Sequence, residues 1–347
     1  MRTLVVNPGS SSLKVSLLDD GREVPDDGGP YDAVGVRFVH GGTRTSAVLV
    51  TREVLEELAE VSELAPLHNP PALEAARDLT SEHPDTPVVA CFDTTFHATI
   101  PAAAATYALP REWREAWGLR RYGFHGLSHA YAARTSAEML RRPVEELRIV
   151  TCHLGGGASL CAVRGGRSVD TTMGLTPMEG LVMQTRSGSI DPGLMLHVMR
   201  SRGVSAEELE RVLEHESGLR GLTGTSGDLR EVRAAIEAGS DAAAAGIEVY
   251  VHRLVREIGA MAAATGGVDA LVFTGGVGEH APDVRLATVA RLDFLGLAID
   301  ELLNDEVADD ADVSASGAGA STLVVAARED LEIEREVRAV VSGAGRS

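Results

Sequence analysis

Alternating hydrophobic and polar positions begin with the first residues of the chain. Residues 4–6 are a short run rich in β-branched side chains, residues 8–12 have the composition of a turn, and residues 13–17 alternate between apolar and polar. Such a pattern predicts a strand, a turn and a half-buried second strand. We therefore expect a β-hairpin over residues 3–18.

A second, looser version of this pattern follows much further along the chain. Residues 148–153 have a strand-like pattern, residues 154–159 are rich in glycine and serine, and further strands are predicted at 160–163 and 168–172. Turns of this kind offer the backbone N–H and hydroxyl groups that bind phosphate oxygens. The two hairpins predict a duplicated α/β fold with a nucleotide held in the cleft between the halves.

Other periodic segments fill the rest of the chain. Strands are expected at 34–39, 88–92, 269–274 and 323–326, and helices near 52–63, 71–82, 127–141, 191–214, 241–265 and 329–341. Residues 309–320 are polar and small, which predicts a loop. We expect the last helix to pack on the first half, which gives an N-terminal domain of residues 1–94 plus 331–347 and a C-terminal domain of residues 95–330.

Composition narrows the functional classes. The chain has 347 residues, of which 44% are hydrophobic and 24% charged, and its net charge is −19. This charge argues against nucleic acid or an anionic membrane as a partner, because both need a basic surface. No membrane-length apolar run and no signal-peptide pattern is present, so we expect a cytoplasmic enzyme. The cysteines at 91, 152 and 161 lie in apolar runs, which predicts buried reduced thiols.

Lys14 is the only lysine among 32 lysine and arginine residues, and it lies at the end of the first predicted turn. An ammonium is a compact point charge on a flexible stem, whereas a guanidinium is a planar fork. A phosphate-binding role for Lys14 explains why an ammonium is kept there. The alternative is a chance remainder of a compositional bias toward arginine.

Seven motifs, in order along the chain, carry a family resemblance. They are Asn7–Lys14, Asp93–His97, Arg121–Gly126, His153–Gly157, Pro177–Leu181, Thr185–Gly193 and Phe273–Glu279. In these motifs the chain resembles the acetate kinase (acetokinase) family of the sugar kinase–actin–heat-shock protein superfamily. The resemblance implies an actin/hexokinase-like (ribonuclease H-like) fold of two duplicated α/β domains. It also implies a cytoplasmic homodimer that transfers a phosphoryl group reversibly from ATP to acetate, giving acetyl phosphate and ADP, with Mg²⁺, or Mn²⁺ in its place.

The resemblance also implies roles for individual residues. Arg37 would bind acetate or acetyl phosphate, Arg186 and His125 would stabilise the transition state, and Asp93 would be the active-site acid or positioning residue. Mg²⁺ would be linked to Asn7 and Glu329. The acetate methyl group would contact Val39, Leu67, Phe124 and Pro177, which could equally be ordinary core residues. The nucleotide would contact Ser10, Ser12, Lys14, His153, Leu154, Gly155, Gly156, Gly157, Asp228, Leu229, Arg230, Gly276, Val277, Gly278, Glu279 and His280.

Chemistry refines two of these roles. A carboxylate substrate is already a nucleophile at neutral pH, so we expect Asp93 to orient an arginine or Mg²⁺ rather than to act as a base; capping of the following helix is the alternative. His125 and His129 have the i,i+4 spacing of a zinc pair, but no third ligand lies at a recognisable spacing. We therefore expect His125 to donate to the phosphoryl oxygens and His129 to cap a helix or to pack.

Several positions depart from the family pattern and bear on rate and nucleotide preference. The chain has Gly156 where the family usually has Asn, Gln184 where it has Gly, Val36 where it has His, and both His280 and Arg328 where it has Asn. The stretch between Lys14 and Arg37 is also shorter than in a typical member. Two alternatives to an acetate kinase remain: a propionate or butyrate kinase, and a nucleotide-binding homologue with weak or no kinase activity.

Overall fold

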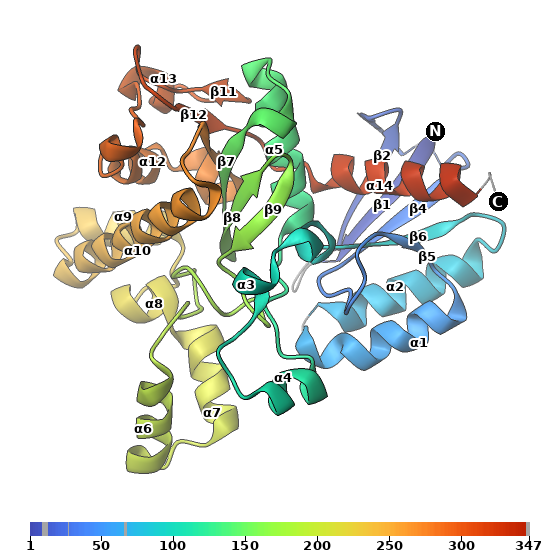
Figure 1. Ribbon diagram of the computed structural model, residues 1–347, viewed down its shortest axis with the longest axis horizontal. Helices are drawn as coiled ribbons and strands as arrows, with labels where there is room; N and C mark the ends of the chain where they lie inside the picture. Colours follow the sequence, from blue (N-terminus) through green and yellow to red (C-terminus); the bar gives the residue numbers. More distant parts are fainter. Residues whose placement is uncertain (9–12, 27, 66–67, 345–347) are drawn as a thin grey trace. The chain divides into compact units, whose positions relative to one another are not determined.

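The computed structural model describes residues 1–8, 13–26, 28–65 and 68–344, and the chain forms two compact units (Figure 1). Unit 1 consists of Met1–Ile100, Tyr122–Tyr131 and Ala327–Ser347, and unit 2 consists of Pro101–Arg121 and Ala132–Ala326. Each unit is built around one six-stranded sheet.

Unit 1 contains a mixed sheet with the strand order β3-β2-β1-β4-β6-β5. Its strands are β1 (Arg2–Pro8), β2 (Leu13–Asp19), β3 (Arg22–Val24), β4 (Ala33–Phe38), β5 (Val48–Leu49) and β6 (Val88–Phe92). The central strands β1, β4 and β6 are parallel, whereas β2, β3 and β5 pair antiparallel with their neighbours. The carboxyl ends of β1, β4 and β6 therefore meet at one edge of the sheet, where ligand sites of α/β proteins collect.

Helices cover both faces of this sheet. The helices of unit 1 are α1 (Arg52–Glu60), the 3₁₀ segments Val61–Leu64 and Thr95–Thr99, α2 (Asn69–Glu82), the start of α5 (Gly126–Leu140) and α14 (Glu329–Ala344). Alternate strand residues point to opposite faces. Val36 and Phe92 accordingly pack with Leu58 of α1 under α1 and α2, whereas Val89 and Cys91 pack under α14.

Unit 2 repeats the same topology. Its strands are β7 (Arg148–Leu154), β8 (Ala158–Arg164), β9 (Arg167–Thr171), β10 (Ala270–Thr274), β11 (Ala311–Asp312) and β12 (Ser321–Val324). The order β9-β8-β7-β10-β12-β11 matches β3-β2-β1-β4-β6-β5 strand for strand, with the same parallel and antiparallel pairings. The predicted duplicated α/β fold is confirmed, while the nucleotide cleft between the halves stays a prediction.

The helices of unit 2 include one long element and many short ones. They are α3 (Ala102–Ala105), α4 (Arg111–Trp117), the rest of α5, α6 (Pro192–Arg202), α7 (Ala206–Arg211), α8 (Gly218–Thr223), α9 (Leu229–Glu237), α10 (Asp241–Thr265), α11 (Gly275–His280), α12 (Pro282–Val289) and α13 (Glu301–Asp305), with a π-helical turn at Val212–Glu216 and 3₁₀ turns at Val144–Glu146 and Asp293–Leu295. The Ser240 hydroxyl accepts from the backbone N–H of Ala243 at the start of α10. A buried stripe of α10 that includes Tyr250, Leu254 and Ile258 lies against β7 and β8.

Most predicted elements are confirmed, and three predictions need correction. The alternation over residues 13–17 does not mean half burial at the start of β2, because Leu13, Lys14 and Val15 are all exposed. The predicted helix at 191–214 is interrupted at Gly203, whose φ of +71° ends α6. The predicted loop at 309–320 contains the short strand β11.

Two expectations about the sequence as a whole can also be compared with the structure. Cys91, Cys152 and Cys161 are buried and free, as expected. Within the described ranges, every helix is too short or too polar to cross a membrane.

The close approach of α14 to the sheet depends on a glycine. A Cβ atom on Gly35 of β4 would overlap the Ile333 side chain and lie 2.8 Å from Cγ2 of Val337. We therefore expect Gly35→Ala to lower the free energy of unfolding by about 1–3 kcal/mol, measured by urea denaturation. Gly343→Ala, near the end of the same helix with nothing within 4 Å of its Cβ position, is the matched control. Equal stability of the two variants would contradict this packing argument.

Candidate functional site

A buried arginine–aspartate pair lies at the carboxyl ends of β4 and β6. Arg37 Nε donates to Asp93 Oδ1 at 2.9 Å, and Arg37 Nη2 donates to Asp93 Oδ2 at 2.6 Å. The parallel register places Arg37 beside Cys91, two residues before Asp93. The backbone therefore brings the side chains of Arg37 and Asp93 together at this end of the sheet. The side chain of Asp93 is 1% exposed and that of Arg37 is 13% exposed.

Two further residues complete a cluster around Arg37. Nη1 of Arg37 donates to Asn7 Oδ1 at 3.0 Å and to Glu329 Oε2 at 2.9 Å. The amide nitrogen of Asn7 also donates to Glu329 Oε2, at 2.9 Å. The cluster therefore joins the ends of β1, β4 and β6 to the first residue of α14.

Electrostatic effects within this cluster oppose one another. Burial raises the pKa of the Asp93 carboxyl, and the Arg37 charge and hydrogen bonds act in the opposite direction. Both carboxyl oxygens accept hydrogen bonds from Arg37, which is the geometry of an ionised carboxylate. The capping alternative for Asp93 is wrong, because the residue at the N-cap of the following 3₁₀ helix is Thr94.

His125 is held beside Asp93 by the backbone. The backbone N–H of His125 bonds the Asp93 carboxylate, and Gly126 N donates to the Asp93 backbone oxygen at 2.9 Å. A Cβ atom on Gly126 would overlap that same oxygen. His125 itself has a φ of +57°, a left-handed conformation that costs a non-glycine residue roughly 1–2 kcal/mol. The segment around His125 therefore docks on Asp93 at the cost of local strain.

A buried histidine next to the cluster was not found by sequence reasoning. His40 is fully buried after β4, its Nδ1 accepts from Gly42 N at 3.0 Å, and Asn69 Nδ2 donates to its backbone oxygen at 2.9 Å. The His40 ring packs edge-on against Tyr122 and Phe124. Because Nδ1 accepts a hydrogen bond, the proton of the neutral ring lies on Nε2. None of the seven motifs contains His40, so its burial could be recognised only from the fold.

The other predicted unit 1 residues lie as follows. Val39 and Phe124 are buried, at 7% and 1% exposure. Lys14 is exposed on β2 and is the cross-strand partner of Asn7. Ser10, Ser12 and Leu67 lie outside the described residues. His129 is buried and packs against the His97 ring, as predicted.

In unit 2 the structure brings two predicted nucleotide segments together. The turn Gly155–Gly157 joins β7 to β8, and α11 begins directly after β10, which pairs with β7 so that Thr274 lies beside His153. Gly275 has a φ of +79°, and a Cβ there would lie 2.8 Å from the Leu154 backbone oxygen. The predicted residues at 153–157 therefore lie next to those at 276–280.

A buried arginine that sequence reasoning missed fixes α11. The side chain of Arg285 is 1% exposed and donates to the backbone oxygens of Gly278 at 2.9 Å and Glu279 at 2.7 Å. Its other N–H groups donate to the side-chain and backbone oxygens of Asn304, each at 2.7 Å. Burial lowers the pKa of Arg285. No motif marks this residue, and its burial could not be foreseen from local sequence.

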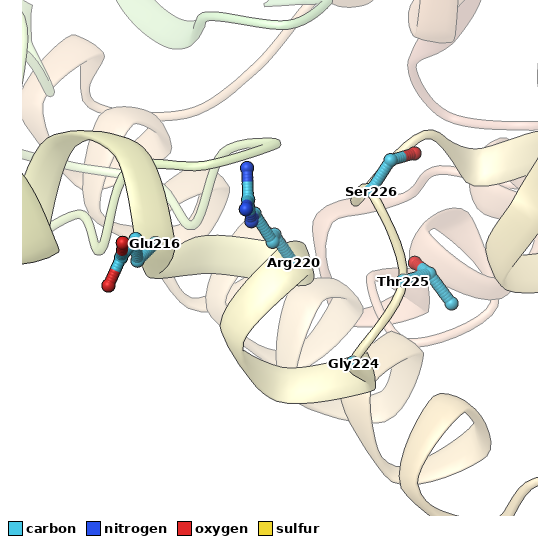
Figure 2. A pocket seen from close by; sticks show the side chains of 5 residues that line it. All are labelled: Glu216, Arg220, Gly224, Thr225 and Ser226. Atoms are coloured by element: carbon cyan, nitrogen blue, oxygen red, sulfur yellow. The ribbon is translucent and has the colours of Figure 1, made fainter.

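The predicted residues Asp228, Leu229 and Arg230 start α9, next to a cavity. Asp228 accepts from Arg230 N at 2.9 Å and forms an ion pair with the Arg230 side chain, which lowers the pKa of Asp228 to about 2. The cavity has a volume of about 500 Å³. It is lined by Glu216, Arg220, Gly224, Thr225 and Ser226, and Figure 2 shows Arg220 on α8 and Thr225 and Ser226 on the segment that follows.

Arg186 lies half-buried in the long segment between β9 and α6. Its Nη1 donates to the Pro177 backbone oxygen at 3.3 Å, and its Nε lies 4.0 Å from Glu214 Oε1. Burial lowers the pKa of Arg186, and Glu214 opposes this shift. A charge with so distant a counter-ion can interact strongly with an anionic ligand.

The start of this segment is held by a network that sequence reasoning missed. Arg121 donates to the backbone oxygens of Thr172 and Met173, at 3.0 and 2.9 Å, and to Glu179 Oε1 at 2.7 Å. The Tyr107 hydroxyl donates to Glu179 Oε2 at 2.5 Å, and burial raises the pKa of Tyr107. The motifs contain Arg121 and Glu179, but their separation in sequence hides the contact.

Comparison with known proteins gives matches over almost the whole chain. The profile of the Acetokinase family matches residues 23–335. The acetate kinase of Synechococcus sp. (strain JA-2-3B'a(2-13)) is 50% identical over 311 residues, which cover 89% of this chain and 77% of the relative. The acetate kinase of Clavibacter michiganensis subsp. michiganensis is 48% identical over 316 residues, which cover 90% of this chain and 80% of the relative.

Solved structures of acyl kinases also match this chain over nearly its whole length. The crystal structure of Porphyromonas gingivalis acetate kinase matches with a TM-score of 0.91 and 33% identity, covering 98% of this chain and 99% of that chain. A propionate kinase from Francisella tularensis matches with a TM-score of 0.88 and 32% identity, with the same coverage.

His40 gives a prediction about pH and stability. Burial lowers the pKa of His40 to about 4 from an ordinary 6.5. Between pH 6.5 and pH 4, the His40 ring is therefore protonated in the unfolded chain and neutral in the folded chain. Stability is therefore lost as pH falls from 6.5 to 4, by about 3 kcal/mol. His40→Asn keeps an acceptor for Gly42 N and should remove this part of the pH dependence, measured by urea unfolding at several pH values. Parallel profiles for the two proteins would show that His40 does not titrate in this way.

Proposed function

Because the chain belongs to the acetokinase family, we propose that it transfers a phosphoryl group reversibly from ATP to acetate, forming acetyl phosphate and ADP. The observation that carries the proposal is the buried cluster of Arg37, Asp93, Asn7 and Glu329 at the carboxyl ends of β1, β4 and β6. It combines a carboxylate-binding cation with oxygen ligands for a divalent ion.

Arg37 is the proposed ligand of the acid substrate. Its Nε, its Nη1 and one N–H of Nη2 already donate to Asp93, Asn7 and Glu329. A guanidinium has five N–H groups, so one N–H of Nη2 is left without a partner among the described residues. The bidentate edge of the guanidinium is thus occupied by Asp93, and Arg37 offers the substrate carboxylate a single hydrogen bond and its charge.

Asp93 is proposed as a positioning residue. Acetate is ionised at neutral pH and needs no base. Both Asp93 oxygens accept from Arg37, and the backbone N–H of His125 bonds the same carboxylate. Asp93 therefore fixes the orientation of Arg37 and the position of His125, which we propose as a donor to the transferred phosphoryl oxygens.

Asn7 and Glu329 fit a magnesium ion in their chemistry. Mg²⁺ prefers oxygen ligands and is held in nucleotide sites by one or two protein groups together with phosphate oxygens and water. Asn7 Oδ1 and Glu329 Oε2 both accept from Arg37 Nη1, so these two oxygens lie close together. When bound, Mg²⁺ would neutralise charge on the nucleotide phosphates; Mn²⁺ would suit the same ligands.

The nucleotide is proposed to bind unit 2. The turn Gly155–Gly157 and the start of α11 lie side by side, and Arg285 holds the backbone of α11. Arg186, with only a distant counter-ion, is proposed to stabilise the negative charge of the transferred group. Asp228, Leu229 and Arg230 are proposed to contact the nucleoside.

The acid substrate has one supported alternative. A propionate kinase is among the similar solved structures, and each added methylene changes binding in an apolar pocket by only about 1–3 kcal/mol. Propionate is therefore the second candidate acceptor, with Val39 and Phe124 proposed as walls of the pocket for the alkyl group. A cytoplasmic homodimer is proposed on the family resemblance alone.

The proposed reaction predicts that the chain forms acetyl hydroxamate from ATP, Mg²⁺, acetate and hydroxylamine. Asp93→Asn should reduce kcat/KM about 100-fold, because the amide cannot accept both Arg37 hydrogen bonds and Arg37 is displaced. Asp85→Asn, at an exposed aspartate before β6, is the matched control and should retain full activity. Comparing kcat/KM for acetate, propionate and butyrate identifies the acid, and no hydroxamate with any of the three would refute the proposal.

Lys14 gives a separate prediction. If its compact ammonium binds a phosphate oxygen, Lys14→Arg should lower kcat/KM for ATP by at least about tenfold although the charge is kept. The reverse exchange Arg22→Lys, on an exposed position of the neighbouring strand β3, should have no effect. A Lys14→Arg enzyme with near-normal kcat/KM would show that a point charge is not needed there.

A further inference from the structure

Gln184 is the only glutamine in the sequence, and it lies in unit 2 between β9 and α6. Its backbone is fixed on two sides. Gln184 N donates to the Gly156 backbone oxygen at 3.2 Å, and the Gln184 backbone oxygen accepts from Arg220 N at 2.9 Å. This residue therefore joins the turn between β7 and β8 to the helix that borders the 500 Å³ cavity.

Two glycines make room for the Gln184 residue. Gly227 has a φ of +82°, and a Cβ atom there would overlap the Gln184 backbone oxygen and lie 3.1 Å from Gln184 Cγ. On the other side, a Cβ atom on Gly156 would lie 3.2 Å from Gln184 Oε1. The side chain therefore extends from Gly227 to Gly156, and its carboxamide lies at the glycine turn.

The carboxamide makes no hydrogen bond to any described residue, although Gln184 is half-buried. A carboxamide carries two N–H donors and one acceptor oxygen. Its two N–H groups are therefore available to water or to a ligand. Its neighbour, the turn Gly155–Gly157, belongs to the nucleotide site proposed above, and such a turn offers backbone N–H groups to phosphate oxygens.

We propose that the Gln184 carboxamide donates a hydrogen bond to the phosphate chain of the nucleotide and so determines the affinity for the phosphoryl donor. This inference rests on the proposed function, because it assigns a residue to the same nucleotide site. The carboxamide is a neutral donor, so it can bind a phosphate oxygen without adding a permanent positive charge. A site that must also release ADP is served by such a donor. Purely structural packing of Gln184 between the two glycines is the competing explanation.

Three substitutions separate these explanations. Gln184→Met keeps the length of the side chain and its packing but has no donor, Gln184→Ala removes both, and Gln184→Glu keeps the shape and adds a negative charge. A hydrogen bond to a charged group predicts that the Met and Ala variants raise Kd for ADP and KM for ATP by about tenfold or more. The Glu variant should raise both further, because its charge repels phosphate.

The readouts are Kd for ADP and for adenosine by calorimetry, and KM for ATP and for acetate in the acyl kinase assay. The full-length wild type and each variant are compared, with melting temperatures to verify folding. Affinity for adenosine and KM for acetate should stay at the wild-type value, because only the phosphates lose a contact. Wild-type ADP affinity in Gln184→Met, or an equal loss of ADP and adenosine affinity, would overturn the inference.

A double variant that moves the side-chain amide from position 184 to position 156 tests whether ADP affinity can be restored. Because a Cβ atom on Gly156 would lie close to the Gln184 amide oxygen, an asparagine at 156 can place its amide in the same space once Gln184 is removed. The double variant Gly156→Asn, Gln184→Gly should recover ADP affinity relative to Gln184→Gly alone, and failure to recover would contradict the assigned position of the amide.

If the wild type forms acetyl phosphate but Gln184 variants bind ADP normally, only this inference fails. If the wild type binds no ADP at all, the proposed function fails as well.

Discussion

The bidentate pair between Arg37 and Asp93 is the interaction on which unit 1 depends. Removing two opposite charges from water is costly, and their attraction offsets that cost only when the geometry is good and the remaining donors find partners. Here Asn7 and Glu329 accept the remaining Nη1 hydrogens, so the pair fixes the relative positions of four segments far apart in the sequence. His125 is tied to the same carboxylate through its backbone N–H. A pair that we propose to serve the chemistry is thus also the contact that holds these segments together, so we expect that breaking it disturbs both.

The duplicated fold could be predicted because each half begins with a hairpin whose local pattern is strong. The β-branched run before Asn7 and the apolar run before His153 predict strands, and the glycine and serine residues that follow predict turns. The same local rule misjudged Leu13 and Val15, which are exposed although their alternation indicates burial. Periodicity shows which residues share a face, but only the tertiary structure decides whether that face is covered. Short elements such as β5 and β11 were missed for a related reason, since two-residue strands form only where a neighbouring strand edge is available.

The candidate site was predictable where a residue belongs to a motif and unpredictable where its role depends on a distant contact. The motifs and the family resemblance indicated Asp93 and Arg37, but not that Asp93 occupies the bidentate edge of Arg37. They gave no sign of the buried His40 ring, and Gln184 could be read only as a departure from a pattern. Its position over Gly156 follows from long-range packing between the segment after β9 and the turn after β7. Chemistry-bearing residue types can thus be recognised locally, whereas their partners require the fold.

The position of the single lysine differs from the positions of the buried arginines. Arg285 donates to three backbone oxygens and one amide oxygen inside unit 2, and Arg121 joins two backbone oxygens to a carboxylate. A planar fork with five N–H groups can cross-link several acceptors, which a single ammonium cannot do with the same rigidity. Arginine at these positions is therefore demanded by structure and not only by composition. Lys14 lies instead at the exposed start of β2, opposite Asn7, where a flexible side chain can adjust its position to a bound ligand. Buried guanidinium groups thus hold the backbone in place, whereas the one lysine lies at an exposed position.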